Sequence, residues 1–253
     1  MSWFEEWFDS PLYEKLYAYR NEEEARLLAG LIEKEIPKNQ FPKLLDLGCG
    51  RGRHSVTLAR MGYHVTGLDL SEEAIKKARK KAEDEGLKNV KFLTGDMRDP
   101  VAGLFDAVLN LFTSFGYFIE DEENSRVFDS VDKMLRKNGR LLVDFMNASK
   151  VEKDLTSQES GEYQDIQYSI KRWIENEMVF KKITFHLNGD SKSYTERVKL
   201  YGEEWFRTEL EKRDFEIYKC YGSYEGDPFE EGSSSRLIFL AEKKTRIDQD
   251  WQD

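Results

Sequence analysis

The sequence LLDLGCGRGRHS occupies residues 44–55 and decides how the chain folds. Its first four residues are mostly apolar, a run that is long enough for a buried parallel strand and too short for a helix. Gly48, Gly50 and Gly52 follow at alternate positions, and glycine permits backbone angles and close ligand approach that other residues do not. A helical apolar pattern then runs to Gly62. The stretch predicts a strand, a glycine turn and a helix, and ligands bind open α/β sheets where such turns leave the strands.

The spacing of the glycines and the neighbouring acid restrict what this turn can bind. A dinucleotide fingerprint places its third glycine three residues after the second. This chain has Arg53 at that position, and the third glycine comes one residue early, at Gly52. Asp46 places a carboxylate at the strand end, which suits a ligand that carries positive charge better than a pyrophosphate. A tight turn without a ligand is the alternative, although packing alone does not require three glycines and an acid.

The stretch Asp46-Leu47-Gly48-Cys49-Gly50-Arg51-Gly52 resembles the first motif of the class I S-adenosylmethionine-dependent methyltransferases. The resemblance covers about residues 40–150. It implies S-adenosyl-L-methionine as the cofactor, with Asp46, Gly48, Cys49 and Gly50 against its methionine and ribose parts. It also implies a doubly wound, Rossmann-like α/β fold, in which a seven-stranded, mostly parallel sheet contains one antiparallel strand.

Two further acids follow predicted strands in the order that this family implies. Asp69 and Leu70 end the second predicted strand, where an acid accepts hydrogen bonds from the ribose hydroxyls. Asp96 and Met97 follow the third predicted strand, 89–94, where the family's acid bonds the adenine amino group and the next residue covers the ring.

The resemblance also implies residues around the sulfonium and the methyl acceptor. The family places residues after the fourth strand there, and aromatic faces attract cations. The candidates in this chain are Asn110, Leu111, Phe112 and Phe115, with core packing as the alternative for the phenylalanines. Relatives use a tyrosine and a basic residue of the N-terminal segment to reach the cofactor's carboxylate or to close the site. Tyr17 and Arg20 are the nearest matches.

The alternation of strands and helices changes in the second half of the chain. The helix before the fifth strand has an apolar face that includes Leu135, and Asn138-Gly139 is predicted to end it. Period-2 alternation then predicts an antiparallel meander of about three strands with a hairpin turn at 188–190. The predicted strands of the meander are 166–174, 178–187 and 191–201, followed by a helix at 203–213 and closing strands at 215–224 and 236–243.

These patterns predict a Rossmann-like cofactor-binding domain in two pieces, 1–146 and 202–245, whose first 40 residues form a helical cap. The meander, 147–201, is expected to be an inserted lid, a substrate-binding piece or a dimerisation piece. The sequence therefore leaves open a monomer or a homodimer through the inserted strands.

Composition restricts the partners. The chain has 253 residues and a net charge of −10, which disfavours nucleic acid as a substrate. Its two cysteines, Cys49 and Cys220, form no disulfide framework and no metal-ligand spacing. The acidic N-terminus lacks the features of a signal peptide, and no long apolar run is present. A cytoplasmic protein without a membrane partner is expected.

The predicted reaction is in-line methyl transfer to an oxygen or nitrogen of a small molecule, which depends mainly on alignment of the reactants and exclusion of water. A base is needed only if the acceptor must lose a proton. His54 is expected to be a helix-start residue, and no catalytic residue is identified. The alternatives are a non-catalytic cofactor-binding scaffold and a nicotinamide-dependent oxidoreductase, against which the position of Gly52 argues.

Overall fold

The computed structural model describes residues 7–17, 22–163, 166–187 and 190–243. Seven strands of the described chain form one sheet in the order β10-β11-β5-β4-β1-β2-β3. β11 is antiparallel to both of its neighbours, and the other pairs are parallel, which confirms the predicted mixed sheet. The strands are β1 (Lys43–Leu47), β2 (His64–Asp69), β3 (Val90–Thr94), β4 (Phe105–Asn110), β5 (Leu135–Met146), β10 (Phe215–Tyr221) and β11 (Arg236–Lys243).

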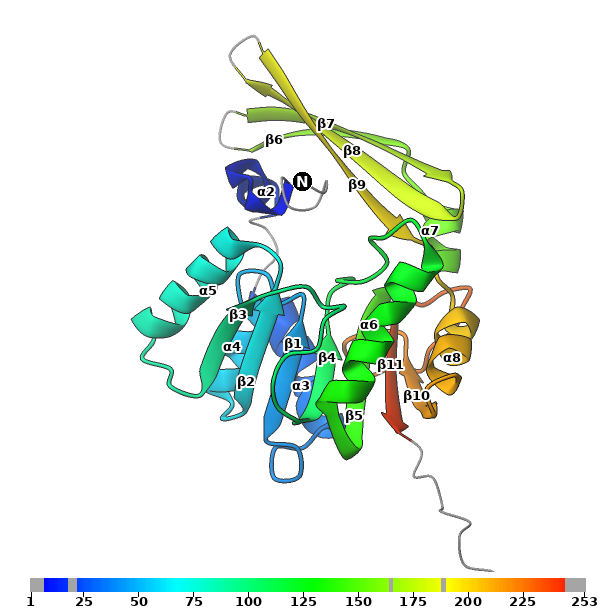
Figure 1. The fold of residues 1–253 in the computed structure, drawn as a ribbon. Helices are drawn as coiled ribbons and strands as arrows, with labels where there is room; N and C mark the ends of the chain where they lie inside the picture. The colour runs from blue at the N-terminus through cyan, green and yellow to red at the C-terminus, as the bar shows by residue number, and fades with distance from the viewer. Residues whose placement is uncertain (1–6, 18–21, 164–165, 188–189, 244–253) are drawn as a thin grey trace, which may run out of the picture.

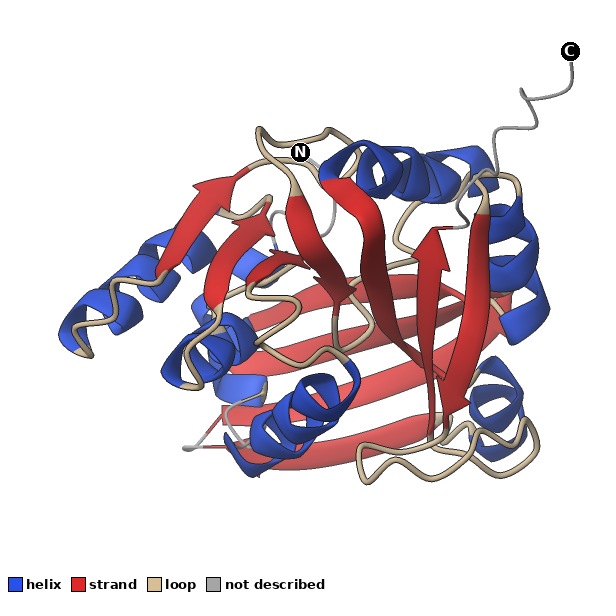
Figure 2. Ribbon diagram, turned by 90° about the horizontal axis from the view of Figure 1, so that it is seen from below, coloured by secondary structure: helices blue, strands red, loops and turns tan. Residues whose placement is uncertain are grey.

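Helices cover both faces of this sheet (Figure 2). Alternation within β1 shows why: Leu44 packs into one apolar cluster, whereas Leu45 and Leu47 pack into another on the opposite face. One face carries α3 (Glu22–Glu35), α4 (Arg53–Arg60) and α5 (Glu72–Asp84), and the other carries α6 (Asp121–Met134) and α8 (Glu203–Glu211). This is the doubly wound arrangement. None of the described helices is both long and apolar enough to cross a membrane.

A second, four-stranded antiparallel sheet follows β5 and α7 (Ala148–Asp154). Figure 1 shows it above one end of the main sheet. The sequence predicts three of its strands; the fourth, β6, reads QESGEY and lacks apolar alternation, so only its pairing with β7 identifies it. The strands are β6 (Gln158–Tyr163), β7 (Ile166–Glu175), β8 (Met178–Leu187) and β9 (Asp190–Lys199). Residues 188–189 of the expected hairpin turn lie outside the described residues.

The first 40 residues contribute to two different cores. α3 belongs to the helical layer of the main sheet, where Leu28 and Ile32 are fully buried. α2 (Pro11–Leu16) instead lies against the second sheet, because Trp7, Leu16 and Tyr17 share an apolar cluster with residues of β7, β8 and β9. The N-terminal segment and the second sheet are therefore packed together.

One predicted helix end is wrong. α6 ends at Met134, and β5 begins directly at Leu135, which pairs with Phe105. The register then shifts, so that the next pair joins Ala107 to Arg140. Asn138, which has a φ of 59°, lies in this irregular part of β5. The turn signal at 138–139 produces an irregularity within the strand, not the end of the helix.

Packing against Phe92 requires a glycine at position 52 of the turn. The φ of Gly52 is +76°, and a Cβ there would lie 2.8 Å from the Phe92 ring. We expect Gly52→Ala to lower the free energy of unfolding by roughly 2–4 kcal/mol, the sum of left-handed strain and overpacking. Urea unfolding measures this. The matched control is Gly30→Ala on α3, where no heavy atom lies within 4 Å of the new Cβ. That change should stabilise the protein by about 0.5–1 kcal/mol; equal effects of the two substitutions would contradict the argument.

Candidate active site

A cavity of about 1340 Å³ lies where β1, β2 and β4 end, and residues of the second sheet also line it. Pockets for one small ligand are typically about 300–1,000 Å³, so this cavity is larger than a typical site for one small ligand. Ten of the twelve residues that the sequence predicts as cofactor-binding line it: Tyr17, Asp46, Gly48, Cys49, Gly50, Asp69, Leu70, Asp96, Met97 and Leu111. Asn110 does not line it, and Arg20 lies outside the described residues.

Main-chain hydrogen bonds hold the glycine turn against β2. The N–H groups of Gly48 and Cys49 both donate to the carbonyl oxygen of Leu68, at 2.8 and 3.0 Å. The φ of Gly48 is +73°, and a Cβ there would lie 2.6 Å from the Cβ of Ser114. Glycine at position 48 therefore allows the loop after β4 to approach the turn closely.

Two carboxylates meet at this turn, of which Asp46 is buried and Asp69 is partly buried. Asp46 is 2% exposed, and one of its oxygens accepts a hydrogen bond from the hydroxyl of Ser55 at 2.5 Å. Asp69 accepts from the N–H groups of Gly50 at 2.7 Å and Ser71 at 2.9 Å. Burial raises the pKa of Asp46 to about 6, and the charge of Asp69 adds to the shift. Burial also raises the pKa of Asp69. A cationic ligand would relieve this repulsion.

Asp96 is held differently. Its carboxylate accepts from the backbone N–H of Arg98 at 2.8 Å and from the Nε of the same residue at 3.0 Å. Arg98 also pairs with Glu123 on α6. Burial raises the pKa of Asp96, but the hydrogen bonds from Arg98 outweigh it and leave the pKa below its usual range. Asp96 therefore lines the cavity with an arginine already bound to its carboxylate.

The pKa of Asp46 leads to a prediction about stability. The pKa of Asp46 is about 6 in the folded protein and about 3.9 in the unfolded chain. The protonated carboxyl therefore contributes most to stability below pH 4, and this contribution is lost as the pH rises from about 4 to 6. Asp46→Asn should therefore raise the melting temperature of the ligand-free protein at pH 7. It should also remove part of the decrease in stability between pH 4 and 6. Differential scanning calorimetry at several pH values measures both. An unchanged pH profile would contradict the shifted pKa.

The residues after β4 separate into three roles. Leu111 and Phe112 line the cavity. Asn110 is 2% exposed, and its amide donates to the carbonyl oxygens of Leu47 and Ser114. Asn110 therefore holds the loop after β4 against the end of β1. Phe115 is 1% exposed and stacks on Phe128 in the core. A contact of Asn110 or Phe115 with a ligand is therefore not supported by the geometry, and the alternative of core packing holds for Phe115.

Sequence reasoning missed a buried ion pair behind this loop. Arg236, the first residue of β11, donates to the fully buried carboxylate of Asp144 in β5 at 2.7 Å. The same carboxylate accepts from the N–H of Phe112 and from the hydroxyl of Tyr224, both at 2.9 Å. The pair is far apart in the sequence. An aspartate within the mostly apolar stretch 141–146 and an arginine directly before the apolar stretch 237–241 were the only signal.

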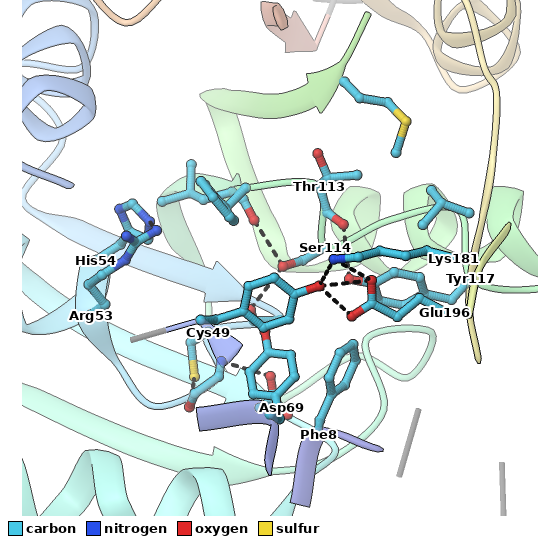
Figure 3. Close-up of a pocket in the computed structure, with 18 of the residues that line it drawn as sticks. Phe8, Cys49, Arg53, His54, Asp69, Thr113, Ser114, Tyr117, Lys181 and Glu196 are labelled. Carbon is cyan, nitrogen blue, oxygen red and sulfur yellow. Dashed lines mark hydrogen bonds and ion pairs between the residues drawn. The ribbon is translucent and has the colours of Figure 1, made fainter. Parts of the chain in front are cut away.

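The second sheet contributes a polar cluster on the other side of the cavity. Glu196 of β9 accepts from the hydroxyl of Tyr17 at 2.7 Å and from the indole N–H of Trp7 at 2.6 Å. Lys181 of β8 donates to the hydroxyl of Tyr17 at 2.5 Å. In the close-up, Lys181 and Glu196 lie across the cavity from His54 (Figure 3). The Tyr17 hydroxyl, expected at the cofactor, thus ties the N-terminal segment to the second sheet.

The histidines that the sequence offers lie in different settings. His54 is the second residue of α4, 8% exposed, and lines the cavity. His64 begins β2 on the surface, and His186 is exposed on β8 beside Ser191. In the part of the chain that the structure describes, no three His, Cys, Asp or Glu side chains form a group that could hold a metal ion.

Comparison with known proteins shows which family this chain resembles. A sequence profile described as a methyltransferase domain matches residues 40–206. YqeM of Bacillus subtilis (strain 168), whose name assigns it provisionally to the methyltransferases, is 30% identical over 227 residues, which are 85% of this chain and 89% of that protein. An S-adenosylmethionine-dependent methyltransferase from Clostridium acetobutylicum has a similar fold, with a TM-score of 0.79 at 21% identity, covering 92% of this chain and 97% of that one. CalS10 is an amino pentose methyltransferase from Micromonospora echinaspora whose structure holds the cofactor. Its fold is also similar, with a TM-score of 0.70 at 20% identity, covering 93% of this chain and 98% of that one.

Proposed function

Because this chain belongs to the class I S-adenosylmethionine-dependent methyltransferases, we propose that it transfers the methyl group of the cofactor to a nitrogen or oxygen of a small molecule. The observation that carries the proposal is the convergence of Asp46, Asp69 and Asp96 on one cavity at the strand ends. Asp46 is buried and Asp69 is partly buried, and burial raises the pKa of both, which suits a cofactor with a positively charged sulfur and an ammonium group. Bound there, that cofactor supplies a methyl group activated for transfer.

The residues of the chain would then hold and align the two reactants. We propose that Asp69 accepts from the ribose hydroxyls and that Met97 covers the adenine, as the family resemblance implies. Gly48 and Gly50 allow the main chain to approach the methionine part closely. Leu111 and Phe112, which follow β4, line the cavity beside the glycine turn and would help to exclude water from the transfer.

The acceptor is proposed to lie between these residues and the second sheet. Residues of α7, β7, β8 and β9 line that part of the cavity, so we assign 147–201 as a lid that shapes the acceptor site. A net charge of −10 and a site covered by this sheet favour a small acceptor over a nucleic acid. CalS10 has a similar fold at 20% identity, so an amino sugar is a reasonable first acceptor to test.

Isothermal titration calorimetry with S-adenosylmethionine, S-adenosylhomocysteine and NAD tests the cofactor. We expect binding of the first two at micromolar concentrations and none of NAD; the reverse would overturn the proposal. A panel of amines, amino sugars and hydroxylated compounds, read out by release of S-adenosylhomocysteine, then tests turnover. Cofactor binding without turnover on any acceptor would favour a non-catalytic scaffold, whose partner would be sought on the second sheet.

A further inference from the structure

The loop that follows β4 forms a wall of the cavity between the glycine turn and the second sheet. On one side, the hydroxyl of Ser114 donates to the carbonyl oxygen of Gly48 in the turn at 3.1 Å. On the other side, the carbonyl oxygen of Gly116 accepts from the N–H of Lys199, the last residue of β9, at 2.8 Å. Thr113 and Ser114, both labelled in the close-up, line the cavity (Figure 3). The conformation of this loop therefore shapes both halves of the cavity.

Two residues of the loop have a strained backbone. Phe112 and Thr113 have left-handed φ values of 57° and 60°, which are unfavourable for residues with a Cβ and especially for the β-branched threonine. Such strain persists only where surrounding contacts fix it, and it is common at ligand sites. The loop therefore needs partners that hold these two residues in this conformation.

Asp144 holds both strained residues from behind the loop. Its carboxylate accepts from the N–H of Phe112, and its backbone carbonyl oxygen accepts from the N–H of Thr113, both at 2.9 Å. Hydrogen bonds to a charged group are roughly twice as strong as those between neutral groups. Asp144 is fully buried and does not line the cavity. Its effect on a ligand must therefore pass through the loop.

Arg236 holds the same two residues from the cavity side. Its Nε donates to the Asp144 carboxylate at 2.7 Å, and its Nη2 donates to the hydroxyl oxygen of Thr113 at 2.9 Å. Its guanidinium carbon lies 5.7 Å from the centre of the Phe112 ring, and that of Arg53 lies 4.8 Å from the same point. Aromatic rings attract cations at these distances. The ion pair thus fixes the backbone of the loop, and Arg236 also contacts both of its cavity-lining side chains.

We propose that Asp144 and Arg236 are positioning residues, which hold the loop at 111–114 in the conformation that binds the cofactor and aligns the acceptor. The proposal rests on the proposed function, because methyl transfer depends on the alignment of two reactants. Without the pair, the loop would relax, and fewer molecules would be ready to bind. The apparent dissociation constant rises by the reciprocal of the competent fraction, and the strain of one such residue is enough for about tenfold.

The test begins with Asp144→Asn, which keeps the size of the side chain and one oxygen but removes a charge that lies outside the cavity. Asp129→Asn, at an exposed residue that pairs with Arg213, is the matched control for the loss of one negative charge. Both are also made in a Thr113→Gly background, because glycine adopts a positive φ without strain. Melting temperatures establish that each variant is folded, and calorimetry measures the dissociation constants of S-adenosylmethionine and S-adenosylhomocysteine.

The two backgrounds should respond differently. With threonine at position 113, Asp144→Asn should weaken the binding of both compounds about tenfold, and Asp129→Asn should leave it within about twofold. With glycine at position 113, Asp144→Asn should weaken binding only about threefold, because the strain at Phe112 remains. A loss of stability alone would not depend on residue 113 in this way. Equal losses of affinity in the two backgrounds, or no loss in either, would overturn the proposal.

An independent measurement covers the case in which the wild type binds neither compound. That result would overturn the proposed function, and amide hydrogen exchange followed by NMR would then test the positioning role in the ligand-free protein. The N–H groups of Phe112 and Thr113 should exchange at least about tenfold faster in Asp144→Asn than in Asp129→Asn, because the loop opens locally. Equal exchange rates in the two variants would show that the ion pair does not hold the loop.

Discussion

Asp69→Ala is expected to weaken S-adenosylmethionine binding by about 100-fold or more. The carboxylate accepts hydrogen bonds from the N–H groups of Gly50 and Ser71, and we propose that it also accepts from the ribose. Hydrogen bonds to a charged group contribute about 1.5–3 kcal/mol each, and 2.7 kcal/mol corresponds to 100-fold in affinity. Alanine would remove the ribose contact and also release the glycine turn. Isothermal titration calorimetry at constant ionic strength measures the loss.

Two further variants separate these contributions. Asp69→Asn keeps one carbonyl oxygen, so we expect its affinity for S-adenosylmethionine to lie between those of Asp69→Ala and the wild type. Asp84→Ala, at the exposed end of α5 beside Lys80, removes an aspartate of the same charge outside the cavity and should leave binding within twofold. If Asp69→Ala bound the cofactor as tightly as Asp84→Ala, the assignment of Asp69 to the cofactor would be wrong.

The part of the site that depends on local sequence was predictable. A glycine turn needs residues that adopt positive φ, and Gly48, Gly50 and Gly52 all do. The carboxyl ends of parallel strands meet at one edge of a sheet, so Asp46, Asp69 and Asp96 had to approach one another once their strands were recognised. Local patterns were sufficient here because each residue lies within, or just after, the strand that positions it.

The remainder depends on contacts between distant segments. Nothing in the sequence near Trp7 or Tyr17 indicates that their partner is Glu196. Strand β6 is identified by the strand it pairs with, not by its own residues. The Asp144–Arg236 pair joins β5 to an antiparallel strand, so the sheet order must be known before the two side chains can be placed together. Position in the sheet, not residue type, determines these roles.

That ion pair carries the second large prediction: Asp144→Ala is expected to lower the free energy of unfolding by about 3–5 kcal/mol. The change leaves the guanidinium of Arg236 in the protein without its carboxylate, and it also leaves the N–H of Phe112 and the hydroxyl of Tyr224 without their acceptor. The loop at 112–113 would then lose the contact that holds its left-handed backbone. Urea unfolding at pH 7, followed by circular dichroism, measures the change.

A control variant and a double variant test whether the loss of stability comes from the burial of the Asp144–Arg236 pair. Asp129→Ala breaks a similar Asp–Arg pair with Arg213, but Asp129 is 49% exposed, so the loss should stay below about 1 kcal/mol. Asp144→Leu combined with Arg236→Met removes both charges, and the double variant should be more stable than Asp144→Ala because no unpaired charge remains. Equal destabilisation by Asp129→Ala and Asp144→Ala would mean that the pair does not hold the loop.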